Sequence, residues 1–312
     1  MKNDGKMFRI KVPASTANLG PGFDSIGLAL GLYLQVDVYP ADYWEIIHLS
    51  KELEIFPTDE SHFICRIANE VASEFGKKLD PCRLFISSEI PLTRGLGSSA
   101  SAIVAGIELA DAVGRLNLTR EDKVRISSKY EGHPDNAGAS VCGGMVVGMH
   151  EDEGTDLVSF HLDYIRVIAV IPEYELPTED SRNVLPEELS FARAVKASAI
   201  SNTFLAAFLS RNYELAGQMM KKDLFHQPFR RKLVPHMDRI EQAARDAGAF
   251  GTALSGAGPT VICLSEKDKA SSAALSLAQE FPQYTVAVLE IDNTGSVVEA
   301  LGSGSSLPEY KQ

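Results

Sequence analysis

One segment of the sequence reads Pro91-Leu92-Thr93-Arg94-Gly95-Leu96-Gly97-Ser98-Ser99-Ala100-Ser101. It follows a predicted strand over 82–90 and opens a predicted helix of small residues over 99–113. Gly95 and Gly97 lack a Cβ, so their backbone can adopt positive φ and come close to an anion. The free N–H groups and the dipole at a helix start favour phosphate. The segment therefore predicts a phosphate loop, although a tight strand-to-helix turn without a ligand would account for the same residues.

Two other phosphate-binding patterns do not fit this segment. The Walker A pattern, G-x-x-x-x-G-K-[ST], occurs nowhere in the sequence. Gly95-x-Gly97-x-x-Ala100 does match the degenerate dinucleotide pattern. That pattern requires a second parallel strand ending in an acidic residue about 20 positions on. Here a second predicted helix follows, with Thr119 at its start and Asp122 as a capping partner. We therefore do not expect a dinucleotide site.

A second segment, Glu131-Gly132-His133-Pro134-Asp135-Asn136-Ala137-Gly138, concentrates chemical groups next to glycines. We expect residues 133–144 to be irregular, and such density in a loop favours chemistry over packing. Asp135 could accept a proton from a hydroxyl, and Glu131 could hold Mg²⁺. A purely structural alternative is that Asp135 or Asn136 caps a helix. Both roles can coexist in one residue.

A third glycine-rich segment runs from Gly248 to Thr260 and includes Ser255-Gly256-Ala257-Gly258-Pro259. Its pattern predicts a strand, a tight turn and a second strand, and hairpin geometry alone is enough to explain it. This segment supports a functional interpretation only because it occurs together with the other two segments.

The chain has 312 residues, of which 45% are apolar, as in soluble globular proteins. At about 150 residues per domain, this length favours two domains, which we predict over 1–163 and 164–312. Helices and strands in both halves predict an α+β fold. We expect a strand over 7–13 that ends at Pro13, a loop over 14–24, and paired strands over 157–162 and 165–171 at the joint between the halves. The tail 302–312 is expected to be loose.

Charge and composition limit the partners. There are 42 acidic and 30 basic residues, giving a net charge of −12. Binding to a nucleic-acid backbone or an anionic membrane needs a basic face, so neither is expected, although a local pocket can still be positive. No apolar run approaches the roughly 20 residues of a membrane span, and no apolar signal core follows Met1. We expect a cytoplasmic protein whose four scattered cysteines are reduced and mostly buried.

In order and spacing, the three segments resemble the GHMP kinases, a family named after galactokinase, homoserine kinase, mevalonate kinase and phosphomevalonate kinase. The first segment matches the family's Pro-x-x-x-Gly-Leu-Gly-Ser-Ser-Ala phosphate loop, and the third matches its C-terminal glycine-rich motif. The opening Val12-Pro13-Ala14-Ser15-Thr16-Ala17-Asn18-Leu19-Gly20-Pro21-Gly22-Phe23-Asp24 and the string His133-Pro134-Asp135-Asn136 are similar to the branch that phosphorylates homoserine. The similarity spans about residues 8–292.

The resemblance implies a two-domain fold. Its N-terminal α/β domain is related to the second domain of ribosomal protein S5, its C-terminal α+β domain is ferredoxin-like, and ATP binds between them. It also implies ATP-dependent phosphorylation of the side-chain hydroxyl of L-homoserine, a step of threonine biosynthesis, by a homodimer.

The resemblance implies particular roles at the ATP site. The phosphates would rest on residues 91–101, with Gly256 and Gly258 approaching from the C-terminal half. Mg²⁺ would be held by a Ser98 or Ser99 hydroxyl and by Glu131. The residues implied for catalysis are His133, Asp135 and Asn136, with Asp135 either a general base or a group that only positions the hydroxyl.

The implied substrate is a zwitterion, so it requires both charges from the protein. The family pattern places its ammonium at Asp24, near Asn18. A carboxylate is bound well by a guanidinium fork, and Arg182 and Arg230 match the family's substrate arginines. Thr178 would add a hydroxyl. Arg231 is a competing assignment for Arg230.

Two alternatives remain open at this point. Another GHMP kinase, for mevalonate or a sugar, would share the phosphate loop, but mevalonate has no ammonium and a sugar has neither charge. A non-catalytic GHMP-like binding module would be expected to have a damaged phosphate loop or to lack the acidic residues. Neither defect is present in the sequence.

Overall fold

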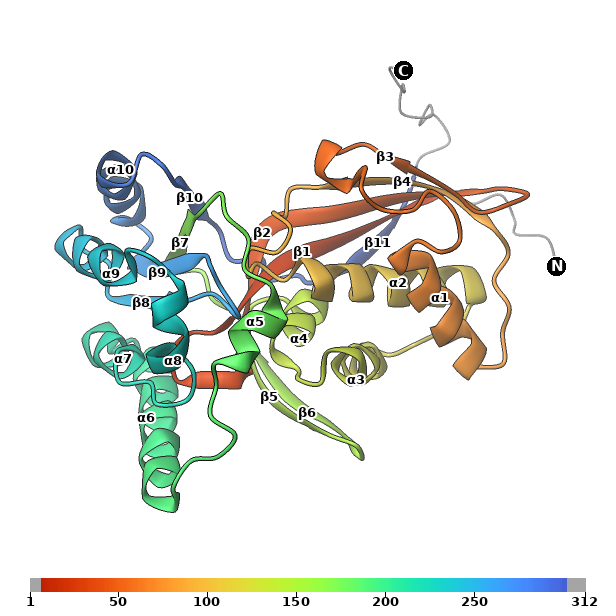
Figure 1. The fold of residues 1–312 in the computed structure, drawn as a ribbon. Coiled ribbons are helices and arrows are strands. Elements are labelled where there is room, and N and C mark those ends of the chain that lie inside the picture. The colour runs from red at the N-terminus through yellow and green to blue at the C-terminus, as the bar shows by residue number, and fades with distance from the viewer. Residues whose placement is uncertain (1–6, 302–312) are drawn as a thin grey trace.

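The computed structural model describes residues 7–301 and contains two sheets with helices packed against them (Figure 1). The first sheet has the strand order β11-β1-β2-β4-β3, with β5 paired to β2 and β6 paired to β5. Its strands are β1 (Phe8–Asn18), β2 (Gly22–Pro40), β3 (Glu45–His48), β4 (Cys82–Ser88), β5 (Met145–Glu151), β6 (Gly154–Phe160) and β11 (Val297–Ala300). The helices of this half are η1 (Lys51–Leu53), α1 (Phe63–Glu74), α2 (Ser98–Gly114), α3 (Arg120–Glu131) and α4 (Asp135–Cys142).

Helix α2 lies at the centre of the first core. It packs against α1 on one side and against β1, α3 and α4 on others, and its small residues allow these close approaches. A Cβ on Gly106 would lie 2.7 Å from the Ile67 side chain of α1. The capping box expected at Thr119 and Asp122 is present and starts α3. The loop before α2 is therefore held between a strand and a helix that is packed on several sides.

The second sheet has the order β10-β7-β9-β8, and all its pairs are antiparallel. Numbered along the chain, this order is 4-1-3-2, the ferredoxin-like arrangement. Its strands are β7 (Ile165–Ile171), β8 (Gly251–Leu254), β9 (Val261–Glu266) and β10 (Thr285–Leu289). The helices of this half are α5 (Thr178–Asn183), α6 (Phe191–Leu209), α7 (Tyr213–Met220), α8 (Gln227–Arg230), η2 (Arg231–Leu233), α9 (Met237–Asp246) and α10 (Ala270–Glu280).

Alternating residues of the second sheet serve two cores. Ile168 and Cys263 belong to a core shared with α9 and α10, whereas Val167 and Ile262 belong to the large core that includes Phe204 of α6. Both faces of the sheet are therefore covered, and its two central strands, β7 and β9, are apolar apart from Arg166, Ser265 and Glu266. The predicted boundary at 163/164 remains a prediction. The sheets divide between β6 and β7, but β11 returns to pair with β1.

Three local predictions were wrong. The strand does not end at Pro13, and β1 continues to Asn18. Proline has no backbone N–H to donate, and a register shift between Pro13 and Ala14 lets the pairing with β2 continue past it. Strand β6 pairs with β5 rather than with β7. Residues 133–144 are not irregular, because packing against β1 and β2 folds 135–142 into α4 despite its glycine. The tail expected to be loose lies outside the described residues.

All four cysteines are free, and three are buried, as expected. Burial raises the pKa of Cys65 to about 12, so this thiol stays protonated at neutral pH. Within residues 7–301, no helix combines the length and apolar character needed to span a membrane.

Candidate active site

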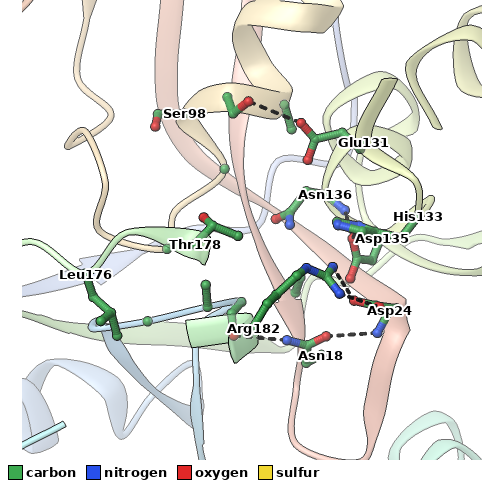
Figure 2. A pocket seen from close by; sticks show the side chains of 18 of the residues that line it. Asn18, Asp24, Ser98, Glu131, His133, Asp135, Asn136, Leu176, Thr178 and Arg182 are labelled. Carbon is green, nitrogen blue, oxygen red and sulfur yellow. Dashed lines mark hydrogen bonds and ion pairs between the residues drawn. The ribbon is translucent and has the colours of Figure 1, made fainter. Parts of the chain in front are cut away.

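An open cavity brings together the three segments singled out in the sequence (Figure 2). Its wall is formed by the end of β1, the loop before α2, the start of α4, helices α5 and α8, and the turn between β8 and β9. These pieces come from both halves of the chain. All the residues predicted for catalysis, substrate and metal binding line this one cavity.

The loop before α2 presents free backbone donors to the cavity. Gly95 and Gly97 have φ of +77° and +74°. Gly97 is the N-cap of α2, and no side chain caps the helix. Among residues 7–301, no acceptor receives a hydrogen bond from the backbone N–H groups of residues 95–100. The loop thus has the donors that a phosphate group would need.

The glycines of this loop are also required by the protein's own packing. A Cβ on Gly95 would lie 2.3 Å from the carbonyl oxygen of Ser255, and one on Gly97 would lie 2.3 Å from Oγ of Ser15. Ser255 Oγ donates a hydrogen bond to the Gly95 carbonyl at 2.6 Å. The third segment therefore docks on the first through backbone contact.

Not every residue predicted for the phosphate loop reaches the cavity. Those that line it are Thr93, Gly95, Gly97, Ser98, Ser99 and Ala100. Those that do not are Pro91, Leu92, Arg94, Leu96 and Ser101. Leu96 is buried in the core. The Arg94 guanidinium donates to the Pro172 carbonyl at 3.0 Å and pairs with Glu175 at 3.3 Å, so it fixes the 172–175 segment.

The start of α4 positions the predicted catalytic residues. Asp135 lies in the first turn, where the helix dipole stabilises a carboxylate. It does not cap the helix, which begins after Pro134. Its Oδ1 atom lies 2.6 Å from Nδ1 of His133 and also accepts the Asn136 N–H at 2.6 Å. Among the described residues only Oδ1 is engaged, which leaves Oδ2 for a ligand.

Glu131 lies beside the loop before α2, where its Oε1 accepts a hydrogen bond from Oγ of Ser99 at 3.2 Å (Figure 2). Burial, together with the charge of Asp135, raises the pKa of Glu131. Burial lowers the pKa of His133, but the hydrogen bond and charge of Asp135 outweigh it, and the net pKa is raised. A carboxylate and a hydroxyl with few other partners suit a hard cation such as Mg²⁺.

Ligand atoms of Asp24, His133 and Asp135 also lie within 4.8 Å of one another. In this group, however, His133 and Asp135 are bonded to each other, and Asp24 is paired with Arg182. The Ser99 and Glu131 pair therefore fits a metal ion better.

Opposite the phosphate loop, Asp24 and Arg182 form a two-pronged ion pair (Figure 2). The two nitrogen-to-oxygen distances are 3.2 and 3.1 Å. Asp24 has φ of +53°, and its N–H donates to Oδ1 of Asn18 at 3.0 Å. Asn18 in turn donates to the Gly256 carbonyl at 3.1 Å. The Asn18 side chain thus links β1, the start of β2 and the third glycine-rich segment.

Arg230 is only 2% exposed, yet it makes no ion pair with any described carboxylate. It donates to the carbonyls of Ser181 at 3.0 Å and Gly256 at 3.1 Å. Burial, and then repulsion from Arg182, lower the pKa of Arg230 to about 10. A buried guanidinium without a counterion favours binding of an anion beside it. Arg231 instead pairs with Asp238 and Glu241 and does not line the cavity.

Sequence reasoning missed the residues that support the site from behind. His226 is fully buried, donates through Nε2 to the Gly20 carbonyl at 3.0 Å and stacks on Phe23. Ser15 donates to Oδ1 of Asn136 at 3.1 Å. Ser15 and Phe23 lie inside the quoted opening motif, so their position was a usable signal. For His226, the only signal in the sequence was its position four residues before Arg230.

A second cavity, mostly apolar, adjoins the phosphate loop and shares Thr93, Ser98 and Ser99 with the first. Its apolar wall includes Leu53, Ile55 and Phe56 from the segment around η1 and Phe63 from α1. No sequence motif marks this cavity, because its residues come from ordinary core positions and a short loop.

The chain matches two family models, GHMP kinases N terminal domain over residues 62–144 and GHMP kinases C terminal over residues 204–283. The chain belongs to the GHMP kinase family. The resemblance inferred from the motifs and the two-domain fold are thereby confirmed.

Within the family, its relatives are homoserine kinases. It is 47% identical to homoserine kinase of Bacillus licheniformis over 94% of this chain and 96% of that one. It is 49% identical to homoserine kinase of Bacillus pumilus over 96% of each chain. The crystal structure of homoserine kinase from Cytophaga hutchinsonii superposes with a TM-score of 0.84 at 25% identity, covering 96% of this chain and 99% of that one.

Proposed function

We propose that this protein catalyses the ATP-dependent phosphorylation of the side-chain hydroxyl of L-homoserine, giving O-phospho-L-homoserine. One observation carries the proposal. A loop of free backbone amides and a set of charges complementary to an amino acid, Asp24 with Arg182 and Arg230, line the same cavity. Homoserine kinases that share almost half of their residues with this chain support the choice of substrate.

ATP is placed by the two adjoining cavities. Its phosphates rest on the N–H groups of residues 95–100, where the dipole of α2 adds to the attraction. Its base enters the apolar cavity beside Ser98 and Ser99, because that cavity adjoins the loop and its apolar wall can bury an aromatic ring. Gly256 and Gly258 approach the loop from the other half of the chain.

The residues present fit a magnesium ion. Ser99 and Glu131 offer two oxygen ligands beside the phosphate loop, and the ion would supply charge neutralisation on the phosphates when bound.

The amino-acid end of the cavity, which we define as Asn18, Asp24, Thr178, Arg182 and Arg230, holds homoserine. Asp24 accepts hydrogen bonds from the ammonium group. The carboxylate lies between Arg182 and Arg230, whose mutual repulsion it relieves. Thr178, at the start of α5, offers a hydroxyl to the same group. The side-chain hydroxyl then extends toward α4 and the phosphate loop.

Asp135 positions that hydroxyl. Phosphoryl transfer through a loose transition state depends mainly on alignment and charge stabilisation. His133 and the Asn136 N–H fix Asp135 through Oδ1, and the free Oδ2 accepts the substrate O–H. We expect Asp135→Asn to raise KM for homoserine and to lower kcat by about 10- to 100-fold. A loss of several powers of ten in kcat at unchanged KM would instead identify Asp135 as a general base.

The proposal is tested by incubating the purified protein with Mg-ATP and homoserine, mevalonate or galactose and identifying the product by ³¹P NMR. We expect phosphorylation of homoserine and at least 10³-fold lower kcat/KM for the other two. Turnover of mevalonate or galactose at a rate comparable to that of homoserine would contradict the assignment of homoserine as the substrate. No turnover of any acceptor would favour a non-catalytic binding module.

The setting of the reaction follows from the substrate. A homoserine kinase serves threonine biosynthesis, and we propose that this protein works in the cytoplasm as a homodimer, without nucleic-acid or membrane partners. Sedimentation equilibrium tests the dimer, and a monomer at micromolar concentration would contradict it.

A further inference from the structure

The ion pair between Asp24 and Arg182 joins the two groups that the proposed function assigns to opposite charges of the substrate. Both oxygens of Asp24 accept hydrogen bonds, one from each terminal nitrogen of Arg182. The carboxylate proposed to bind the ammonium and the guanidinium proposed to bind the carboxylate are therefore paired with each other in this structure. A substrate ammonium approaching Asp24 and a substrate carboxylate approaching Arg182 therefore compete with this pair for the atoms that form it.

The pair bridges two separately anchored pieces of the chain. Asp24 follows the β1–β2 turn and is held by Asn18, as described above. Arg182 belongs to α5, which is fixed by the Ser181 hydroxyl donating to the Ala257 carbonyl at 2.7 Å. Since both backbones are anchored, the side chains can separate by rotation without moving the walls of the cavity.

Opening the pair costs least when a ligand supplies a new partner to both charges, because a bound ligand displaces the water that would otherwise solvate an unpaired one. The side chains are 33% and 40% exposed, so the pair itself contributes little stability. A zwitterion replaces it completely, because its ammonium takes Asp24 and its carboxylate takes Arg182. A ligand with one charge satisfies one side chain and leaves the other unpaired next to Arg230 or Asp135.

We propose that the Asp24–Arg182 pair is a selectivity device that excludes hydroxyl compounds carrying only one of the two charges. The inference rests on the proposed function and deepens it: the device selects zwitterionic hydroxy acids by penalising the others, in addition to attracting the right one. It predicts that removing one member of the pair improves binding of the ligand that the freed member can hold.

The test measures dissociation constants by calorimetry for homoserine and for its two single-charge analogues. These are 4-hydroxybutanoate, which lacks the ammonium, and 3-aminopropan-1-ol, which lacks the carboxylate. We expect Asp24→Asn to weaken homoserine by about 10- to 100-fold but to tighten 4-hydroxybutanoate by about 5-fold. Arg182→Gln should weaken homoserine and tighten 3-aminopropan-1-ol by a similar factor. Unchanged or weaker binding of both analogues would overturn the proposal.

Asp24→Asn could also tighten 4-hydroxybutanoate simply by removing the repulsion between the Asp24 carboxylate and the ligand's carboxylate. A double-mutant cycle with Arg182→Gln separates that effect from release of the ion pair. If the pair is the device, Asp24→Asn tightens 4-hydroxybutanoate only while Arg182 is present, and by less than about 2-fold in the Arg182→Gln background. Equal tightening in both backgrounds would show repulsion alone and refute the device. Asp180→Asn is the matched control, since it removes an exposed carboxylate of α5 but leaves the pair intact. It should change no analogue's affinity.

Two further readouts keep the interpretation clear. ATP affinity should be unchanged in Asp24→Asn and Arg182→Gln, because neither side chain contacts the phosphate loop, and a loss of ATP binding would indicate misfolding. Phosphorylation of homoserine by the wild-type protein tests the proposed function separately. Turnover of homoserine with no gain for either analogue would reject the device and retain the function.

Discussion

The two ends of the cavity are built by different means. The phosphate end consists of backbone N–H groups over residues 95–100, supplied by one continuous segment. The amino-acid end consists of side chains carried by β1 and the start of β2 and, far along the chain, by α5 and α8. The first is open to a ligand as it stands. The second is partly closed on itself by the Asp24–Arg182 pair.

This difference follows from the groups used. A backbone N–H carries only a partial charge, so water can satisfy it while the site is empty, and the peptide plane fixes its direction. A full charge near a protein interior requires a counterion or costs stability. Asp24 and Arg182 neutralise each other, whereas buried Arg230 has no described counterion, and its pKa is accordingly lowered. The amino-acid end therefore carries a buried positive charge, on Arg230, that no described carboxylate neutralises.

The largest effect is expected at the phosphate end. Gly95→Ala places a Cβ 2.3 Å from the Ser255 carbonyl at a φ of +77°. We expect it to separate the third segment from the loop and to lower kcat/KM by about 10³-fold, comparable to the loss of preorganised donors elsewhere. Steady-state kinetics and ATP titration measure this.

Gly76→Ala is the matched control for backbone strain. Gly76 also has positive φ, at +67°, but nothing lies within 4 Å of its Cβ position. It should cost about 1 kcal/mol of stability and leave kcat/KM unchanged. If both substitutions were equally mild for catalysis, the close docking of the loop would have no functional role.

At the amino-acid end, Arg230→Lys keeps the charge but removes the guanidinium fork. We expect KM for homoserine to rise by about 30- to 300-fold with ATP affinity retained, because losing a buried charge-to-charge contact costs about 2–5 kcal/mol and the lysine keeps part of that contact. Arg231→Lys, at a side chain paired outside the cavity, should change KM by less than about 2-fold. The reverse pattern would move the carboxylate contact to Arg231.

The buried His226, which packs behind the amino-acid end, should make the free energy of unfolding depend on pH. Burial, and then the charge of Arg230, lower the pKa of His226 to about 3, whereas an unfolded histidine titrates near pH 6.5. The unfolded state therefore binds more protons between pH 6.5 and pH 3, and stability is lost as pH falls through that window. We expect about 2 kcal/mol less stability from this group at pH 5 than at pH 7.

Urea unfolding at both pH values measures this loss, and His226→Gln should reduce the pH dependence. His62, whose pKa burial lowers to about 4, contributes in the same direction. A pH dependence that His226→Gln leaves unchanged would show that His226 is not buried in its neutral form.

The smallest effect concerns the apolar cavity next to the phosphate end. Phe56→Ala removes an aromatic wall that is already 36% exposed. We expect KM for ATP to rise by about 3- to 10-fold, since only part of the ring's burial is lost, while KM for homoserine stays the same. Tyr43→Ala, at an exposed ring outside both cavities, is the control. A rise in KM for homoserine with an unchanged KM for ATP would contradict the assignment of this cavity to the base of ATP.

Much of the fold was predictable where local chemistry controls it. The helix after Ser98, the capping box at Thr119 and the strands of the second half follow from small-residue runs, a hydroxyl–carboxylate pair and alternation. The failures occurred where packing overrides local preference. Pro13 lies within β1 because a bulge accommodates it, and residues 135–142 form a helix because they pack against β1 and β2.

The sequence by itself determined the phosphate end, because its donors belong to consecutive peptide groups whose geometry is set by two glycines and a helix start. It also determined which charged residues were candidates for the substrate. Only the tertiary structure decided how those charges are paired. Asp24 meets Arg182 across 158 positions, Arg230 is left without a described counterion, and Arg231 is turned toward Glu241. Side chains so distant in sequence acquire partners, and thus a function, only when the two sheets fold the chain back on itself.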